Sequence, residues 1–221
     1  TAASAIADFF ATRAAQGPEP HGDSPIGRLA IAFQRHGLAV DPLCLFCAHL
    51  LCGHERDALT TRLAMSRVQQ LAPEFWDNVD LAARRQSLRK ALGDAQSALN
   101  LLCAERESLL ELLPFCGAHL LQHAPEYLRA VSDVAHAAVE SSWQALRHVP
   151  TTAHTNALVT SALTAHSDDP DAADGVLRHS VERCRGEAVM MGAVRMDGLA
   201  LRWGSQRAKA SREVATCYST L

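Results

Sequence analysis

The chain has 221 residues and a formal net charge of −3, from 21 Lys and Arg residues against 24 Asp and Glu residues. Hydrophobic residues make up 48% of it, which excludes an intrinsically disordered chain. The near balance of charge gives no broad basic field of the kind that nucleic-acid binding uses. No segment approaches the ~20 consecutive apolar residues of a membrane span. Ala and Leu outnumber Ile and Val, so the composition predicts an all-α fold.

The first third of the chain carries several pairs of helix start and stop signals. Ser24 followed by Pro25 is typical of an N-cap and a first helical position, and Gly37 is typical of a C-terminal stop. Asp41 and Pro42 repeat the device before an apolar stretch. These signals predict helices over 2–15, 24–37, 41–53 and 55–71, with a linker rich in Gly and Pro at 17–23.

The most regular pattern lies between residues 78 and 113. Leucine or alanine recurs there every seven residues, and further leucines fill a second seam, which is typical of a coiled-coil stripe. The pattern predicts one long central helix that Pro114 stops or bends sharply. An interaction seam on this helix would consist of Leu88, Leu92, Leu99, Leu102 and Leu109.

Prolines and glycines divide the remainder of the chain. We expect a short helix at 115–124, a longer one from Pro125 to 149 and another at 151–166, followed by a linker at 167–170. Glycines recur through the last fifty or so residues, and some of them are expected to interrupt the helices there. This last segment is therefore expected to contain two or three helices rather than one.

The predicted architecture is a multi-helix bundle in two parts. A bundle domain is expected at 1–166, of which 1–22 are an N-terminal helix and linker, and a helical C-terminal segment at 167–221 is expected to pack on the same bundle. The segments at 46–51 and 115–121 resemble each other in sequence, each with Phe-Cys followed by Ala-His-Leu-Leu. No third copy follows at that interval, so this pair does not establish a repeat.

One stretch after Pro114 carries the residue types that zinc prefers. Cys116, His119 and His123 stand at i, i+3 and i+7, so they share a face of any continuous helix. The competing interpretation is that the cysteines are small buried apolar side chains of the core. The cofactor prediction is none, with zinc or another transition metal at this Cys/His face as the alternative.

Four aspartates form a second candidate cluster at 168, 169, 171 and 174. Grouped carboxylates hold Mg²⁺ or Ca²⁺ in some proteins. Carboxylates also accept hydrogen bonds from the free amides at a helix N-terminus and oppose its positive dipole end. We interpret these residues as helix caps.

Basic residues gather at 84–90 and in the tail, where Arg202, Arg207, Lys209 and Arg212 lie near Trp203. Nucleic-acid binding would require them to join into one stripe with interleaved aromatic residues. We interpret them as solvated helix faces and expect no nucleic-acid partner.

The functional prediction follows from the helices and from the motifs found. We find no motif of a phosphate-binding loop, a dinucleotide-binding turn, a nucleophile elbow or a zinc protease. The odd number of cysteines, seven, argues against a disulfide framework and favours a reducing cytoplasm. The sequence predicts a non-catalytic helical interaction protein, such as an adaptor, an assembly chaperone or a scaffold subunit of a bacterial-type complex, which binds a protein partner or itself through helical faces. The alternative is a metal- or cofactor-binding helical bundle, or an enzyme, that uses the Cys/His face.

Overall fold

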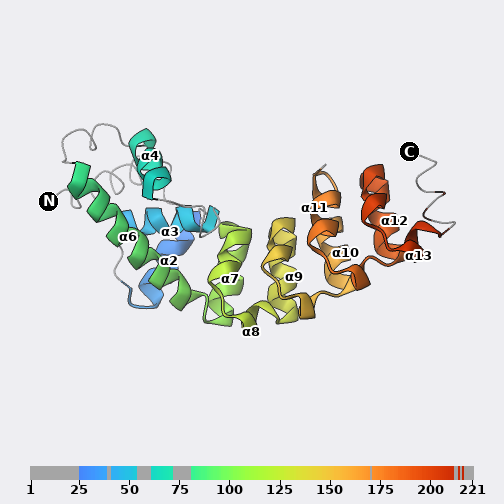
Figure 1. The fold of residues 1–221 in the computed structure, drawn as a ribbon. Coiled ribbons are helices and arrows are strands. Elements are labelled where there is room, and N and C mark those ends of the chain that lie inside the picture. The colour runs from blue at the N-terminus through green and yellow to red at the C-terminus, as the bar shows by residue number, and fades with distance from the viewer. Residues whose placement is uncertain are drawn as a thin grey trace. The chain divides into compact units, whose positions relative to one another are not determined.

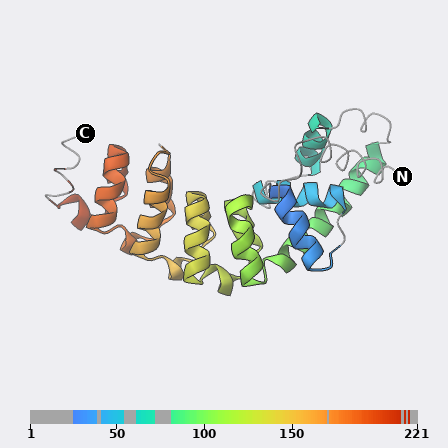
Figure 2. The same cartoon turned by 180° about the vertical axis from the view of Figure 1, so that it is seen from behind.

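The computed structural model describes residues 25–38, 41–53, 61–71, 81–169 and 171–211, together with Val214 and Thr216. Every regular element in these ranges is a helix (Figures 1 and 2), which confirms the all-α prediction. The chain divides into two compact units, Thr1–Ala124 and Pro125–Leu221. The helix predicted at 2–15 and the linker at 17–23 lie outside the described residues.

The first two described helices of the first unit match their predicted positions. The Asp41 side chain caps the second of them by accepting a hydrogen bond from the Leu43 amide at 3.1 Å. The described elements of this unit are α2 (Pro25–Arg35), α3 (Pro42–Gly53), α4 (Thr61–Leu71), α6 (Leu81–Leu102), α7 (Arg106–Cys116) and the 3-10 helix η1 (Ala118–His123).

Helix α3 lies at the centre of the first unit because it is apolar on nearly every side. It packs against α2, α6, α7 and η1 (Figure 1). A helix without a polar face gains most when neighbours cover it all round. Its buried side chains are Leu43, Cys44, Leu45, Phe46, Cys47, Ala48, Leu50, Leu51 and Cys52.

The leucine pattern between 78 and 113 forms two helices, and not the single long helix that the sequence predicted. Helix α6 ends at Leu102 and α7 begins at Arg106. Between them the amides of Ala104 and Glu105 donate to carbonyls three residues earlier, each at 3.3 Å. This spacing tightens the last turn and ends the α-helix. The two shorter helices then pack on α3 separately.

Pro114 does not end α7. It lies inside the last turn with an exposed side chain, and the helix continues to Cys116. The stop comes at Gly117, whose φ of 78° is in the region that favours glycine. The helix predicted at 115–124 is therefore the end of α7 followed by η1.

In the second unit, the two longest predicted helices are broken into shorter pieces. Extended backbone at Val131 and at Ser142 divides the helix expected at 125–149 into three. The helix expected at 151–166 restarts at Thr155, whose hydroxyl accepts from the Leu158 amide at 3.1 Å. The elements are α8 (Glu126–Arg129), α9 (Ser132–Ser141), η2 (Trp143–Arg147), η3 (Thr151–Ala153), α10 (Asn156–Ala165), α11 (Ala172–His179), η4 (Glu182–Cys184), α12 (Glu187–Met196), η5 (Gly198–Trp203) and α13 (Gln206–Lys209).

These elements repeat one pattern that the sequence analysis did not detect. Three copies have a leading helix, a second helix of three or four residues and a longer α-helix, and the first two of these elements recur once more after them. The copies are η1, α8 and α9; η2, η3 and α10; α11, η4 and α12; and η5 and α13, which Val214 and Thr216 follow in helical conformation. The first copy begins at the end of the first unit.

The buried positions repeat together with the helices. In the long helices they fall at i, i+1, i+4 and i+5, in sets of Val134, Ala135, Ala138 and Val139; Leu158, Val159, Ala162 and Leu163; and Val189, Met190, Ala193 and Val194. The first two sets are about 24 residues apart. The third set lies about 31 residues after the second, because the connection between α10 and α11 and the helix α11 itself are both longer than their counterparts.

Within the second unit, successive copies stack in two rows. The leading helices η2, α11 and η5 contact one another in that order, and the long helices α9, α10 and α12 do the same. Figure 1 shows α9, the pair α10 and α11, and α12 side by side in chain order. Each copy covers one face of the next, so the core is continuous along the stack.

Two tryptophans join the leading helices. Trp143 of η2 donates its indole N–H to Asp169 Oδ2 at 2.8 Å, just before α11. Trp203 of η5 donates to Asp174 of α11. A Cβ added at Gly175 would lie 2.2 Å from Cζ3 of Trp143, so this ring packs directly against the α11 backbone and only glycine fits.

Two arginines make equivalent contacts between copies. Arg129, at the end of α8, donates to the His148 carbonyl after η2 at 2.9 Å. Arg185, just after η4, donates to the Trp203 carbonyl at the end of η5 at 3.4 Å. Both caps satisfy a carbonyl at the C-terminus of the next leading helix, where a cation is favoured.

The division between the units differs from the predicted domain boundary at 166/167. That boundary falls within the second unit, where α10 contacts both α11 and α12 across it. The helices described after that boundary, α11 to α13, therefore belong to the same repeat stack as α9 and α10.

Candidate functional site

The leucines of the predicted interaction seam are covered by the first unit itself. Leu88, Leu99, Leu102 and Leu109 have no exposed surface, and Leu92 is half-buried. Helix α6, which carries most of them, packs against α3. Four of the five seam leucines therefore fill the core of this unit, and their side chains are covered within it.

The Cys/His candidate does not lie on one helix. Cys116 ends α7, whereas His119 and His123 belong to η1, and Gly117 interrupts the helix between them. His123 is buried, with Nδ1 2.7 Å from the Gln96 side-chain nitrogen. Among the described residues, no three His, Cys, Asp or Glu side chains are grouped as a metal site requires.

Cys116 lies instead beside other buried thiols. Its hydrogen bond to Cys52, together with burial, raises the pKa of the Cys52 thiol well above its usual value. Burial likewise raises the pKa of Cys103, and it raises the pKa of Cys47 to about 12. A thiol that stays protonated is a poor nucleophile. Cys47, Cys52 and Cys103 therefore act as small apolar side chains of the core.

The aspartates at 168–174 do not act as one cluster. Asp169 accepts from the Asp171 amide at 2.9 Å and from Trp143, and these two bonds lower the pKa of its carboxyl. Asp174 accepts from Trp203 and Arg202, which lower its pKa as well. Asp169 and Asp174 thus have separate hydrogen-bond donors, and Asp169 caps the turn that leads into α11.

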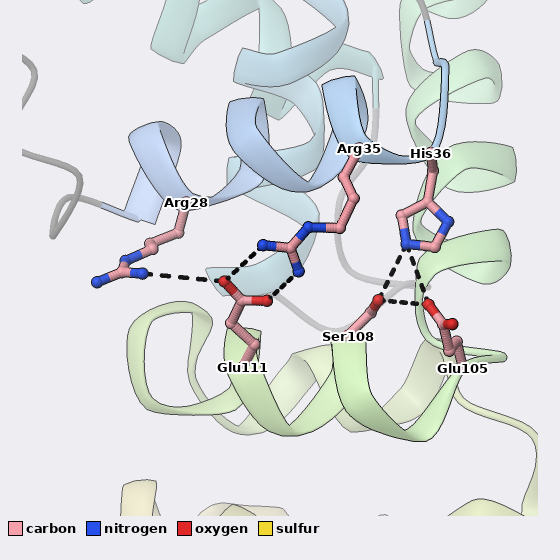
Figure 3. A network of polar contacts seen from close by, with 6 residues as sticks. All are labelled: Arg28, Arg35, His36, Glu105, Ser108 and Glu111. Carbon is pink, nitrogen blue, oxygen red and sulfur yellow. Dashed lines mark hydrogen bonds and ion pairs between the residues drawn. The ribbon is translucent and has the colours of Figure 1, made fainter.

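A polar network joins α2 to α7 at the surface of the first unit (Figure 3). The Arg35 guanidinium donates to both oxygens of Glu111, at 2.6 and 3.5 Å. Arg28 lies 3.9 Å from the same carboxylate and 4.6 Å from the centre of the Phe115 ring. This exposed two-pronged pair links the two helices at the surface of the first unit.

The second half of this network contains a serine, a histidine and a glutamate. His36 Nε2 lies 3.0 Å from the Ser108 hydroxyl and 3.1 Å from Glu105, and the hydroxyl donates to that carboxylate at 2.6 Å (Figure 3). A nucleophilic triad needs the acid and the serine on opposite ring nitrogens. Here both meet the same nitrogen, and Ser108 is only 3% exposed. The trio is therefore a structural clamp.

A cationic cluster lies where the leading helices α11 and η5 meet. Three guanidinium carbons lie 5.4 to 5.8 Å from the centre of the Trp203 ring, those of Arg178, Arg185 and Arg202. Asp174 forms ion pairs with Arg178, at 3.6 Å, and with Arg202. The side chains of Arg178 and Arg202 are 60% and 56% exposed, so this cluster faces solvent.

A signal for this cluster was present in the sequence. Three leading helices end in related tetrapeptides, Ala-Leu-Arg-His at 145–148, Val-Leu-Arg-His at 176–179 and Ala-Leu-Arg-Trp at 200–203. The leucine is the buried or half-buried anchor of its helix, and the arginine that follows is exposed. Comparison of the chain with itself would have found this motif, whereas the search for helix stops and heptads did not.

A shallow hollow of about 220 Å³ lies between α10 and α12. Threonine and serine hydroxyls line one part of it, and apolar side chains with Gly192 line the rest. The lining residues are Thr160, Leu163, Thr164, Ser167, Ala188, Val189, Gly192 and Met196.

None of the helices in the described part of the chain has the length and apolar character needed to cross a bilayer. No protein-family model, no curated protein and no solved structure matches the chain.

Proposed function

We propose that this chain is a non-catalytic interaction protein whose binding module is the repeat stack of the second unit. The observation that carries the proposal is the recurrence of one helical pattern, with the same four buried positions in each of three long helices. A stack of this kind is extended in one direction, so its exposed positions form rows. Proteins use such rows to bind other chains along their length.

The burial of the leucine seam of α6 and α7 also favours a docking surface on the second unit, because that seam is already covered. Its leucines already fill the core of the first unit, so a docking surface has to come from other residues. In the second unit, exposed residues recur at equivalent positions, such as Arg147, Arg178 and Arg202. This protein would serve as an adaptor, an assembly chaperone or a scaffold subunit.

Selection from a random peptide-display library against the immobilised full chain tests this proposal. Peptides should be enriched over an unrelated control protein, and the best of them should slow hydrogen exchange at exposed segments of 143–211. Failure to enrich any peptide would contradict the proposal, and so would protection confined to the first unit.

A further inference from the structure

Arg147, Arg178 and Arg202 occupy the same position in three successive copies of the repeat. Each follows the leucine of its tetrapeptide at the end of a leading helix, and each side chain is exposed. The leading helices η2, α11 and η5 contact one another in that order. The three side chains therefore form a row along the second unit, which we call the arginine row.

The members of the arginine row are close enough to act together. Arg178 and Arg202 share the carboxylate of Asp174, and both guanidinium groups lie against the Trp203 ring. Arg147 and Arg178 both lie near His179. Burial is the main cause that lowers the pKa of the His179 imidazole, and the charges of the two arginines lower it further. The row thus continues from the first of these leading helices to the last.

Positive charge exceeds negative charge in the best-defined part of the row. The guanidinium groups of Arg178, Arg185 and Arg202 surround the Trp203 ring. Among the described contacts, the carboxylate paired with them is that of Asp174. Complementarity to the helix C-termini explains why each arginine is placed where it is. It does not neutralise the excess, because a helix end carries only about half an elementary charge.

The spacing of the row fits a particular kind of anionic ligand. Packed helices lie about 8–10 Å apart, which sets the distance between the backbones of neighbouring rungs, whereas the guanidinium groups of Arg178 and Arg202 converge on Asp174. An extended peptide advances about 3.3 Å per residue, so carboxylates three residues apart are about 10 Å apart. Glutamates at every third residue of an extended segment would therefore meet the row at more than one point, and charge-assisted hydrogen bonds from the guanidinium groups would hold them there.

We propose that the arginine row binds an extended acidic segment of a partner protein. The inference rests on the proposed function and names the chemistry of the partner. A nucleic acid fits less well, because three cations release few counterions and the net charge of the chain is −3. In addition, Trp203 is surrounded by arginines and donates its N–H to Asp174, so its ring is not a free platform for a base.

Fluorescence anisotropy with the full chain tests the inference. The probe is a fluorescein-labelled peptide of five Glu-Ser-Gly units, and the reference is the same peptide with Gln in place of Glu. We expect the acidic peptide to bind more tightly than the reference, and its binding to weaken as salt is raised. The double variant Arg147→Gln/Arg178→Gln should weaken binding by about tenfold, since each exposed ion pair contributes a modest amount.

The matched control is the double variant Arg106→Gln/Arg195→Gln, which removes the same charge from exposed positions outside the row. It should retain the affinity of the unmodified chain, and circular dichroism should show all variants folded. Equal losses in both double variants would overturn the inference, as would failure of the acidic peptide to bind, or tighter binding of an oligothymidylate. If display selection still yields peptides that bind independently of the row, only this inference fails and the proposed function stands.

Discussion

Trp143 packs against the α11 backbone at Gly175, where any larger residue would meet the indole ring. A Gly175→Ala variant places a Cβ 2.2 Å from the ring carbon Cζ3, and both groups are fixed by neighbouring copies of the repeat. We expect the free energy of unfolding to fall by about 1–3 kcal/mol, the usual cost of overpacking. Urea denaturation followed by circular dichroism measures it.

Gly192→Ala is the matched control, since Gly192 lies in α12 and a Cβ added there would have nothing within 4 Å. Alanine is the better helix former by about 1 kcal/mol, so this variant should be neutral or more stable. The account of Gly175 fails if the two variants behave alike. Replacing Trp143 by Leu in the Gly175→Ala background should recover part of the loss.

The burial of His154 leads to a prediction of how the stability of the second unit depends on pH. The side chain is 3% exposed and holds Nε2 3.1 Å from the Val149 carbonyl, and burial lowers its pKa below the ordinary value of 6.5. Below pH 6.5 the unfolded chain therefore takes up a proton before the folded chain does. This contribution to stability is complete above about pH 7 and is lost as the pH falls from about 6.5 through the lower pKa of the folded state.

Urea denaturation at pH 7.5 and at pH 5.5 checks this dependence. The loss between the two values should be smaller in His154→Gln than in the unmodified chain. His49 and His179 shift in the same direction through burial, so part of the loss should remain. The half-exposed His136 supplies the control variant, His136→Gln. An unchanged loss in His154→Gln would mean that His154 does not carry the effect.

At the scale of the elements, we expect the contacts that join copies of the repeat to contribute to stability alongside the helices themselves. Arg129 links the end of α8 to the His148 carbonyl after η2. An Arg129→Met variant keeps most of the aliphatic stem but removes a charged donor, so we expect a loss of about 1.5–3 kcal/mol. Arg195→Met, on an exposed position of α12, should change stability by less than about 0.5 kcal/mol. Chemical denaturation of both variants distinguishes a structural link from a general effect of charge.

Leu99 and Leu101 lie two positions apart on α6, the first in the core and the second at the surface. Leu99 is fully buried and Leu101 is 58% exposed. Leu99→Asp buries an unpaired carboxylate and should cost several kcal/mol, of order 4, whereas Leu101→Asp should have little effect. Melting curves measure the difference. A Leu99→Asp protein with an unchanged melting temperature but an altered assembly mass would show that the seam is an interface between chains.

Helices α6 and α7 show which features of the fold could be predicted from the sequence. Burial of Leu99, Leu102 and Leu109 follows from their spacing, because either one helix or two can keep that stripe inside. The break near Ala104 has no Pro or Gly to announce it, so periodicity alone extends the helix through it. The all-α class depends on composition summed over the whole chain, and for that reason it was predictable.

The candidate site was predictable to a smaller extent. The Cys/His prediction assumed a continuous helix, and the backbone at Gly117 removes that condition. The leading helices are five to eight residues long, too short for a hydrophobic period to identify them. The relation between Arg178 and Arg202 can be recognised only when the copies are aligned, because the alignment places them at the same position of neighbouring helices.

At the scale of the whole molecule, each unit buries its own core. The damage caused by Leu99→Asp should therefore remain in the first unit. Hydrogen exchange read by mass spectrometry should become faster in peptides from 81–124 and stay slow in peptides from α10 and α12. If all of these peptides exchange faster together, the two units unfold as one.

The pattern in the second unit also bears on how such a chain can change in length. Each copy touches its immediate neighbours, and the extra residues at 167–171 are accommodated between two copies without disturbing the order of either row. A duplication of about 24 residues would add one more rung and leave the earlier packing intact. In a closed bundle, by contrast, an additional helix has no vacant place. Gene duplication could therefore change the length of the second unit in steps of one copy, without altering the residues that the existing copies expose.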